Sequence, residues 1–192
     1  MAAEVDRLGM AIARRAAGVI HAEYRALLPL LRELAPKRVA DIGCGYAFFD
    51  LFVARDPGAA LVLIDLENNE HRHFGFNPEG AAYSSLATAK ALLVANGVSA
   101  RKITTLNPRE TAPENVKPVD LAVSFLSCGF HYPVDAYLPF LDKALAPGGA
   151  AIFDLRGSTA AEQSAQLSRF GTLTDLPAPA KARRVLLRKV AA

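Results

Sequence analysis

Short apolar runs alternate with helical patterns along most of this chain, and this alternation restricts the possible fold more than any other feature. After residue 36, strand-like runs are followed by segments whose apolar residues recur every three or four positions. This order is typical of βαβ units, in which crossover helices join parallel strands. The sequence therefore predicts an α/β fold with a doubly wound parallel sheet.

Five strands and three crossover helices are expected in the middle of the chain. The strands are predicted at residues 38–42, 60–65, 102–106, 119–126 and 150–154. The helices are predicted from about residue 46 to 55, from 84 or 85 to 95, and from 133 to 145. Pro147-Gly148-Gly149 is expected to turn the chain into the fifth strand.

The two ends of the chain carry different patterns. Near the N-terminus, apolar residues at helical spacing predict one or two amphipathic helices, with a kink or break at Pro29 and an end at Pro36. After residue 154, a helix at 159–168 precedes two close strands, 171–174 and 184–190, which are expected to pair antiparallel. We thus predict a mostly parallel seven-stranded sheet, Rossmann-like, with an antiparallel last strand. Residues 1–36 would form a helical cover on the domain 37–192, in one compact domain overall.

Composition narrows the functional classes. The chain is 52% hydrophobic and 21% charged, which suits a folded globular domain, and its longest uncharged stretch, 121–134, is too short for a membrane helix. A net charge of +3 from mostly dispersed basic residues makes nucleic acid an unexpected partner. Cys44 and Cys128 have neither a disulfide-framework nor a zinc-site spacing. We expect a cytoplasmic protein that does not bind membranes, and its oligomeric state is left open.

A glycine-rich turn lies between the first predicted strand and the first crossover helix, in the run Asp41-Ile42-Gly43-Cys44-Gly45-Tyr46-Ala47. Gly43 and Gly45 allow a sharp turn and a close approach of the backbone to a ligand, and the helix N-terminus offers free N–H groups. Asp65 follows Gly45 by 20 positions, the spacing at which a carboxylate accepts hydrogen bonds from ribose hydroxyls. These features predict a pocket for a cofactor that contains adenosine.

Residues around the two glycines distinguish between adenosine cofactors. Phe48 stands where a dinucleotide motif needs its third glycine, which disfavours a pyrophosphate ligand. No lysine follows either glycine, as a P-loop would require. The carboxylate of Asp41 would repel a diphosphate and attract an ammonium group. The pattern therefore favours a cofactor with an amino acid moiety.

With Asp41, Gly43, Gly45 and Asp65 in these places, the chain resembles the class I S-adenosylmethionine-dependent methyltransferases over residues 38–190. The first motif of that family is D/E-x-G-x-G-x-G, and Ala47 replaces its third glycine, a small change expected to leave the loop nearly unchanged. The resemblance implies an enzyme that binds S-adenosyl-L-methionine and releases S-adenosyl-L-homocysteine.

The resemblance also implies which residues hold the cofactor. Asp41 and the backbone of Gly43, Cys44 and Gly45 would hold the methionine part, and Asp65 the ribose. Leu66 would contact the adenine edge. Asn107, after the third strand, stands near the position of an acidic residue that often meets the adenine amino group, and its side-chain carbonyl offers an acceptor.

Candidates for the acceptor side come from two loops. His131, after the fourth strand, could take a proton from a hydroxyl or amine acceptor, although a local loop hydrogen bond would also explain it. Tyr132 is expected to line the pocket. His71 and His73 form an H-x-H pair that would project to one side of an extended segment and contact the acceptor. No metal is expected, because this pair lacks a defined third ligand.

A looser resemblance, to small bacterial sugar O-methyltransferases, is carried by Phe74-Gly75-Phe76 and by residues 82–86 and 129–133. It implies a small-molecule acceptor with a sugar-like hydroxyl. The loop at 67–83 would either cover the substrate or pack on the surface of the fold. Two other functions stay open: a partner subunit that binds the cofactor without turnover, and a nicotinamide-dependent oxidoreductase, which Phe48 disfavours.

Overall fold

The structure, a computed structural model, describes residues 2–67 and 84–191, with side chains from residue 9 onward. The two predicted acceptor histidines, His71 and His73, and the segment Phe74-Gly75-Phe76 lie outside the described residues.

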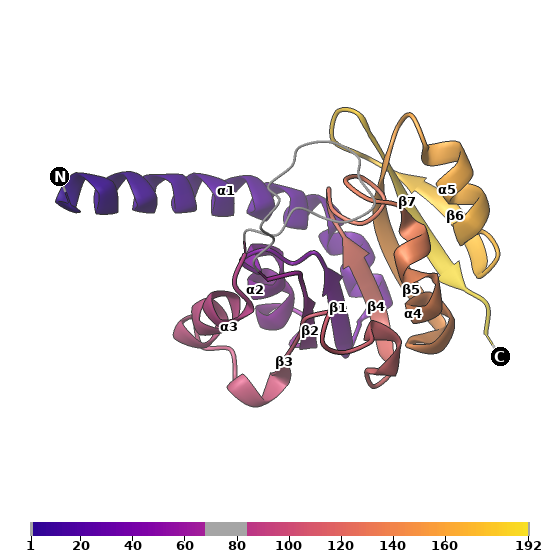
Figure 1. The fold of residues 1–192 in the computed structure, drawn as a ribbon, viewed down its shortest axis with the longest axis horizontal. Coiled ribbons are helices and arrows are strands. Elements are labelled where there is room, and N and C mark those ends of the chain that lie inside the picture. Colours follow the sequence, from indigo (N-terminus) through magenta and orange to yellow (C-terminus); the bar gives the residue numbers. More distant parts are fainter. Residues whose placement is uncertain (1, 68–83, 192) are drawn as a thin grey trace.

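A sheet forms the middle layer of the molecule (Figure 1), and the described residues contribute seven strands to it. Its spatial order is β3 (Ile103–Leu106), β2 (Ala60–Ile64), β1 (Arg38–Ile42), β4 (Val119–Ser124), β5 (Leu145–Arg156), β7 (Ala182–Lys189) and β6 (Gly171–Leu176). β7 pairs antiparallel with β5 and β6, whereas the pairs among β1 to β5 are parallel. The mostly parallel sheet with an antiparallel last strand is therefore confirmed.

Helices cover both faces of this sheet and bury two separate cores. One face packs against α1 (Ala2–Leu34), α2 (Phe48–Arg55) and α3 (Leu86–Ala95). The other packs against a 3-10 turn (Val134–Tyr137), α4 (Leu138–Lys143) and α5 (Ala160–Leu167). Because side chains alternate along a strand, Val39 belongs to the first core and Ala40 to the second. The expected doubly wound architecture is confirmed.

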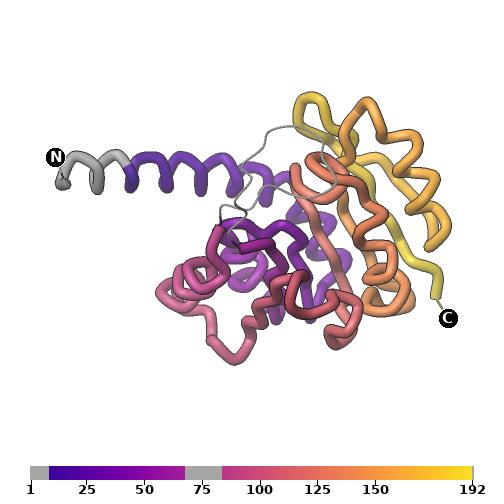
Figure 2. The backbone as a smooth tube through the Cα atoms, in the orientation of Figure 1, coloured from indigo at the N-terminus to yellow at the C-terminus, as the bar shows by residue number. Residues whose placement is uncertain are grey.

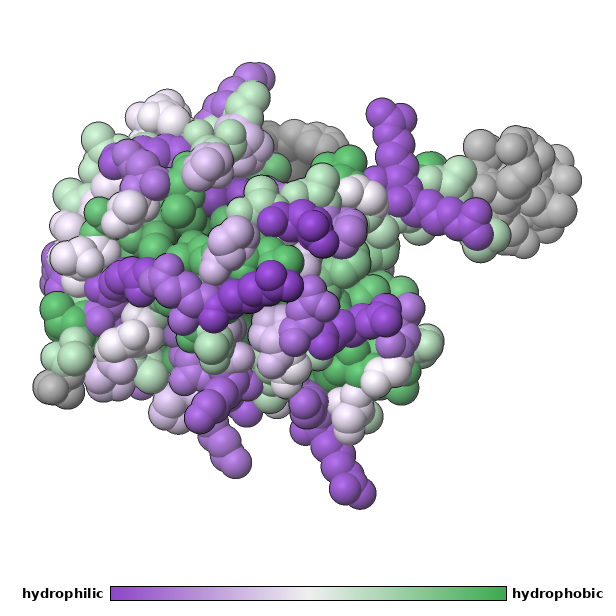
Figure 3. Space-filling view, turned by 180° about the vertical axis from the view of Figure 1, so that it is seen from behind, coloured by the Kyte–Doolittle hydropathy of each residue, from purple (hydrophilic) through white to green (hydrophobic). Residues whose placement is uncertain are grey.

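α1 continues through Pro29 as one helix, so of the one or two helices predicted here a single one is found, without a break at this proline. Pro29 is exposed, while its neighbours Leu27, Leu28 and Leu31 are buried against the body and hold the helix together across the missing backbone hydrogen bond. Burial begins only in the second half of α1, at Tyr24. The first half extends beyond the rest of the molecule (Figures 1 and 3). None of the described helices combines the length and apolar character needed to cross a bilayer.

The segment before β5 differs from the prediction. The expected helix at 133–145 is a 3-10 turn followed by the six-residue α4, and β5 already begins at Leu145. Lys189 explains the early end, because its ammonium group donates to the carbonyls of Leu141, Asp142 and Leu145. The expected turn at Pro147-Gly148-Gly149 is an irregular part of β5, where the register with β4 shifts.

The strand order places three loops at one edge of the sheet. β1 continues outward to β2 and β3, while β4 and β5 lie on its other side, so the direction of winding reverses between β1 and β4. The carboxyl ends of parallel strands share one edge, and ligands bind in open α/β sheets where the winding reverses. The turn after β1, the residues after β2 and the loop after β4 meet there. The backbone tube in Figure 2 follows the same arrangement, with β3 and β6 as the two edge strands of the sheet.

Candidate functional site

The glycine-rich turn is anchored on the end of β2. The Gly43 N–H donates to the carbonyl of Ile64 at 2.7 Å, and the Gly45 N–H donates to Asp65 Oδ2, also at 2.7 Å. Gly43 and Gly45 have φ values of +78° and +55°, in the left-handed region that favours glycine. The Asp65 carboxylate therefore holds the glycine turn in place. This structural role is additional to its predicted contact with a ribose.

The side chain of Ser127 explains why residue 43 is glycine. Ser127 belongs to the loop after β4, and a Cβ atom on Gly43 would lie 1.9 Å from its Oγ. The Ser127 side chain thus occupies part of the space that the absence of a Cβ atom leaves open at Gly43. The same contact joins the glycine turn to the loop that carries His131.

Ala47 adopts a left-handed backbone conformation, which favours glycine. Its φ is +59° and its ψ is 35°, and it is fully buried at the start of α2. A left-handed conformation costs a non-glycine residue about 1 to 2 kcal/mol. The surrounding packing therefore imposes this geometry on alanine and preserves the shape of the turn.

Three carboxyl groups gather at the turn. Asp41, near the end of β1, is 4% exposed, and Asp50, in the first turn of α2, is completely buried. Burial raises the pKa of Asp41 well above its usual value, and the carboxyls of Asp50 and Asp65 raise it further. Burial also raises the pKa of Asp50 to about 6, although its hydrogen bond with Asp41 lowers it. The site therefore combines negative charge with low solvation.

Asp65 is less enclosed and better provided with hydrogen-bond donors. Burial raises its pKa, whereas hydrogen bonds with the Gly45 N–H, the Ser84 side chain and the Leu66 N–H lower it. Burial raises the pKa of the Cys44 thiol, and the three nearby carboxyls add to this effect. Cys44 is accordingly a buried neutral group beside the turn, and a thiolate is disfavoured there.

Leu66 and Asn107 flank Asp65 at the ends of β2 and β3. The Asp65 N–H donates to the carbonyl of Leu106 at 3.2 Å, which brings the two strand ends side by side. Asn107 follows directly, and its Oδ1 accepts the Arg109 N–H at 3.1 Å. This side-chain oxygen thus stabilises a local turn. Its second lone pair can accept a hydrogen bond from a ligand.

His131 and Tyr132 lie in the loop after β4. The His131 N–H donates to the carbonyl of Ser127 at 2.8 Å, and its ring packs edge-on against Phe130. Tyr132 is buried, and burial raises the pKa of its hydroxyl, which also hydrogen bonds to the Ser127 side chain. Both residues thus contact Ser127, and Ser127 in turn contacts the glycine turn at Gly43.

The structure thus brings most of the predicted site residues to one edge of the sheet: Asp41, Gly43, Cys44, Gly45, Asp65, Leu66, Asn107, His131 and Tyr132. Sequence reasoning missed Asp50, Ser127 and Tyr137, whose side chain hydrogen bonds to Tyr132. Asp50 did carry a signal, because it is the one charged residue in the otherwise apolar run 48–54. For Ser127 and Tyr137 the sequence offers no comparable sign.

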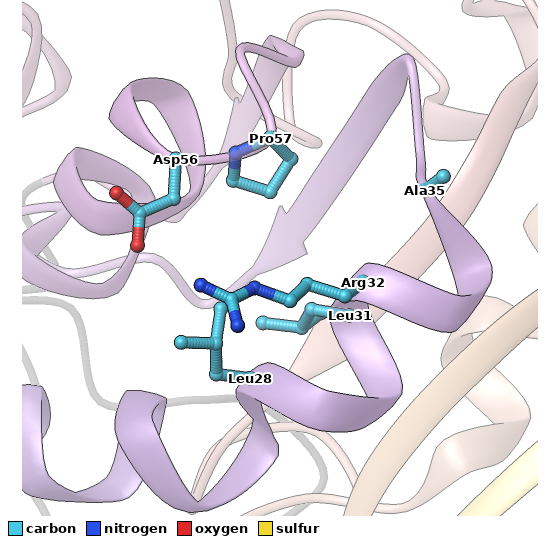
Figure 4. Close-up of a pocket in the computed structure, with 6 residues that line it drawn as sticks. All are labelled: Leu28, Leu31, Arg32, Ala35, Asp56 and Pro57. Atoms are coloured by element: carbon cyan, nitrogen blue, oxygen red, sulfur yellow. The ribbon is translucent and has the colours of Figure 1, made fainter.

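A pocket of about 330 Å³ lies elsewhere, between α1 and the C-terminal end of α2 (Figure 4). Its lining is Leu28, Leu31, Arg32, Ala35, Asp56 and Pro57. Asp56 accepts a hydrogen bond from the Tyr24 hydroxyl at 2.8 Å. Since α2 runs from the glycine turn at its first residue to this pocket at its last, the two sites lie at opposite ends of the helix.

Comparison with known proteins identifies the fold. No family model matches the chain, and no curated protein matches it. Three similar solved structures are a methyltransferase from Geobacter sulfurreducens, the O-methyltransferase TomG from Streptomyces achromogenes, in complex with S-adenosylmethionine, and a candidate O-methyltransferase from Nostoc punctiforme. Their sequence identities to this chain are 18%, 16% and 17%, with TM-scores of 0.61, 0.62 and 0.60. The chain therefore has the fold of the S-adenosylmethionine-dependent methyltransferases, as its sequence motif predicts.

The extent of the match differs among these structures. The alignments cover 95%, 89% and 88% of this chain, and 97%, 80% and 56% of the Geobacter, Streptomyces and Nostoc chains. This chain thus spans nearly all of the first protein and little more than half of the last.

Proposed function

We propose that the protein is an S-adenosylmethionine-dependent methyltransferase that acts on a small-molecule acceptor. The observation that supports this most directly is the turn from Asp41 to Ala47, held by Asp65 at the carboxyl edge of a methyltransferase fold. It combines a sharp backbone turn with carboxyl groups on both sides. TomG, of the same fold, is an O-methyltransferase whose structure contains S-adenosylmethionine.

The residues at the turn fit such a cofactor chemically. The Asp50 carboxyl is buried and poorly supplied with hydrogen-bond donors, which favours a positively charged neighbour, and the cofactor carries an ammonium group. Asp41 would bind this group, with the backbone of Gly43, Cys44 and Gly45 around the methionine part. Asp65 would accept the ribose hydroxyls, and Leu66 and Asn107 would border the adenine.

When bound, S-adenosylmethionine supplies a methyl group that its sulfonium already makes electrophilic. The protein then has to hold the acceptor in line with that methyl group and keep water away. His131 is the proposed base that takes the proton of a hydroxyl or amine acceptor, and Tyr132 would line the same space. His71 and His73 remain proposed acceptor contacts. A sugar-like hydroxyl is the acceptor that the looser resemblance implies.

Binding of S-adenosylhomocysteine by the wild type and by Asp65→Ala tests the cofactor site. We expect calorimetry to show affinity weaker by about 1 to 3 kcal/mol for the variant, because it loses charge-assisted hydrogen bonds. Asp142→Ala, which changes an exposed carboxylate on α4, should bind like the wild type. Equal affinities for wild type and Asp65→Ala would contradict the assignment.

Methyl transfer is tested by incubating the purified protein with methyl-labelled S-adenosylmethionine and a fractionated cell extract, followed by identification of the labelled product. Steady formation of such a product would exclude the alternative of a partner subunit without turnover. A parallel titration with NADH tests the oxidoreductase alternative. That alternative requires the protein to bind NADH and not S-adenosylhomocysteine.

A further inference from the structure

Asp50 is a buried carboxyl group that is poorly supplied with hydrogen-bond donors. Its side chain is completely buried, neither carboxylate oxygen accepts a hydrogen bond of good geometry from the described residues, and the contacts that lower its pKa are with Asp41 and its own backbone N–H. Ionised carboxylates in protein interiors are normally paired with a cation or several donors, because the loss of hydration is costly. Asp50 therefore needs either a positive charge or a proton.

The neighbour of Asp50 is the carboxyl group of Asp41. The two side chains are within hydrogen-bonding reach of each other, one at the end of β1 and the other in the first turn of α2. Two ionised carboxylates can only accept hydrogen bonds, so this contact forms only when one of them holds a proton. Burial raises the pKa of both groups, which agrees with a proton between them.

The surroundings of the pair are negative or neutral. Asp65 at the end of β2 adds a further carboxyl charge that acts on Asp41, and the Cys44 thiol lies beside all three carboxyls. Neither group supplies a positive charge to the pair. In the described part of the chain, no three His, Cys, Asp or Glu side chains are arranged to hold a metal ion. A proton is therefore the partner that this geometry favours in the free protein.

We propose that Asp41 and Asp50 form a carboxyl pair that holds one proton, and that this pair receives the positively charged end of an amino-acid-like ligand. Asp50 is the positioning residue: the pair keeps its one proton when the cation binds, and the hydrogen bond between the two carboxyls orients Asp41 toward the ligand. The single charge of the pair is balanced by one ammonium group, and no proton is released. The identity of the ligand as S-adenosylmethionine rests on the proposed function.

Infrared spectroscopy of the free protein at pH 7 tests the pair directly. We expect a C=O stretching band of a buried protonated carboxyl that is lost in Asp50→Asn, because the amide N–H then donates to Asp41 in place of the proton. Asp41→Asn should lose the band for the reciprocal reason, which provides a second variant if one folds poorly. Asp142→Asn, at an exposed position, should keep it. A wild-type spectrum without this band, or an Asp50→Asn spectrum that retains it, would overturn the proposal.

Adding S-adenosylhomocysteine tests the role of the pair in binding. The band should shift and keep its intensity, and calorimetry in two buffers of different ionisation enthalpy should show no proton release. Asp50→Asn should bind within about threefold of the wild type, whereas Asp50→Leu, which has no donor and leaves Asp41 to hold its own proton, should bind at least tenfold more weakly. Loss of the band on binding, or equal affinity of Asp50→Leu and wild type, would overturn the positioning role. A wild-type protein that shows the band and binds no S-adenosylhomocysteine would instead contradict the proposed function.

Discussion

At the scale of single residues, the candidate site depends on carboxyl groups placed where water is scarce. Asp41 and Asp50 are enclosed between β1 and α2, while Asp65 is partly exposed and receives the Gly45 N–H. The same residue type thus has two roles, set by the surroundings. A proton-sharing pair suits a single cation, and an ionised carboxylate supplied with donors suits hydroxyl groups.

The raised pKa of Asp50 predicts that stability falls as the pH rises. A group whose pKa is about 6 when folded and near 3.8 when unfolded binds more protons in the folded state between these values. Its contribution is complete below about pH 4 and is lost as the pH passes through about 6. We expect urea unfolding to show that the free energy of unfolding of the wild type falls between pH 4 and pH 8 by on the order of 2 kcal/mol more than that of Asp50→Asn. Parallel pH profiles of the two proteins would show that Asp50 holds no proton in the folded state.

His131→Ala tests the base role of the loop after β4. We expect turnover to fall by about 100-fold or more with a hydroxyl acceptor, since general base catalysis typically contributes this much. Affinity for S-adenosylhomocysteine should be unchanged, because the substitution keeps the backbone N–H of His131 that donates to the carbonyl of Ser127. Measurement of kcat together with the cofactor Kd checks both points, and unaltered turnover would remove the proposed role.

At the scale of secondary-structure elements, a buried ion pair connects β5, β7 and α1. The guanidinium of Arg184 on β7 is bound by both carboxylate oxygens of Asp154 on β5, at 2.6 and 2.7 Å, and it also contacts Glu23 on α1. It lies over the Phe125 ring, and Asp154 accepts the Leu126 N–H as well. The cluster thereby fixes the start of the loop that carries His131.

Arg184→Met should destabilise the fold strongly. Removing the cation leaves the buried carboxylate of Asp154 without its main partner, a change that typically costs about 3 to 5 kcal/mol. Glu23→Gln should cost much less, because Glu23 is partly exposed and an amide oxygen still accepts the hydrogen bond. Urea unfolding of both variants measures the difference. A loss under about 1 kcal/mol for Arg184→Met would show that the cluster is not a stabilising link.

At the scale of the whole molecule, α1 divides into a packed part and an extending part. Tyr24, Leu27, Leu28 and Leu31 are buried in the core next to α2, whereas Met10 and Ile12 are exposed. Deleting residues 2–15 should therefore change the free energy of unfolding by less than about 1 kcal/mol. Deleting residues 2–34 should cost several kcal/mol, since each buried Leu contributes about 1.5 to 3 kcal/mol. Thermal and urea unfolding compare the two, and similar losses would contradict this division.

The pattern of the sequence predicted the strands well where a local signal existed. The first strand and the helix capped by Ser85, whose side chain accepts the Thr88 N–H, match the structure closely. The prediction failed where a distant contact decides. Lys189 ends α4 from the far end of the chain, and buried leucines carry α1 through Pro29.

The sequence by itself determined the alternation of strands and helices and the glycine turn with its two motif carboxylates, because periodicity, chain reversal and conformational freedom are local properties of neighbouring residues. Only the tertiary structure decided that Asp50 faces Asp41, that Ser127 closes over Gly43, and that Arg184 joins β7 to α1. These contacts link residues on different elements. Burial and charge pairing depend on distances in space, and these distances cannot be deduced from the spacing of residues along the chain.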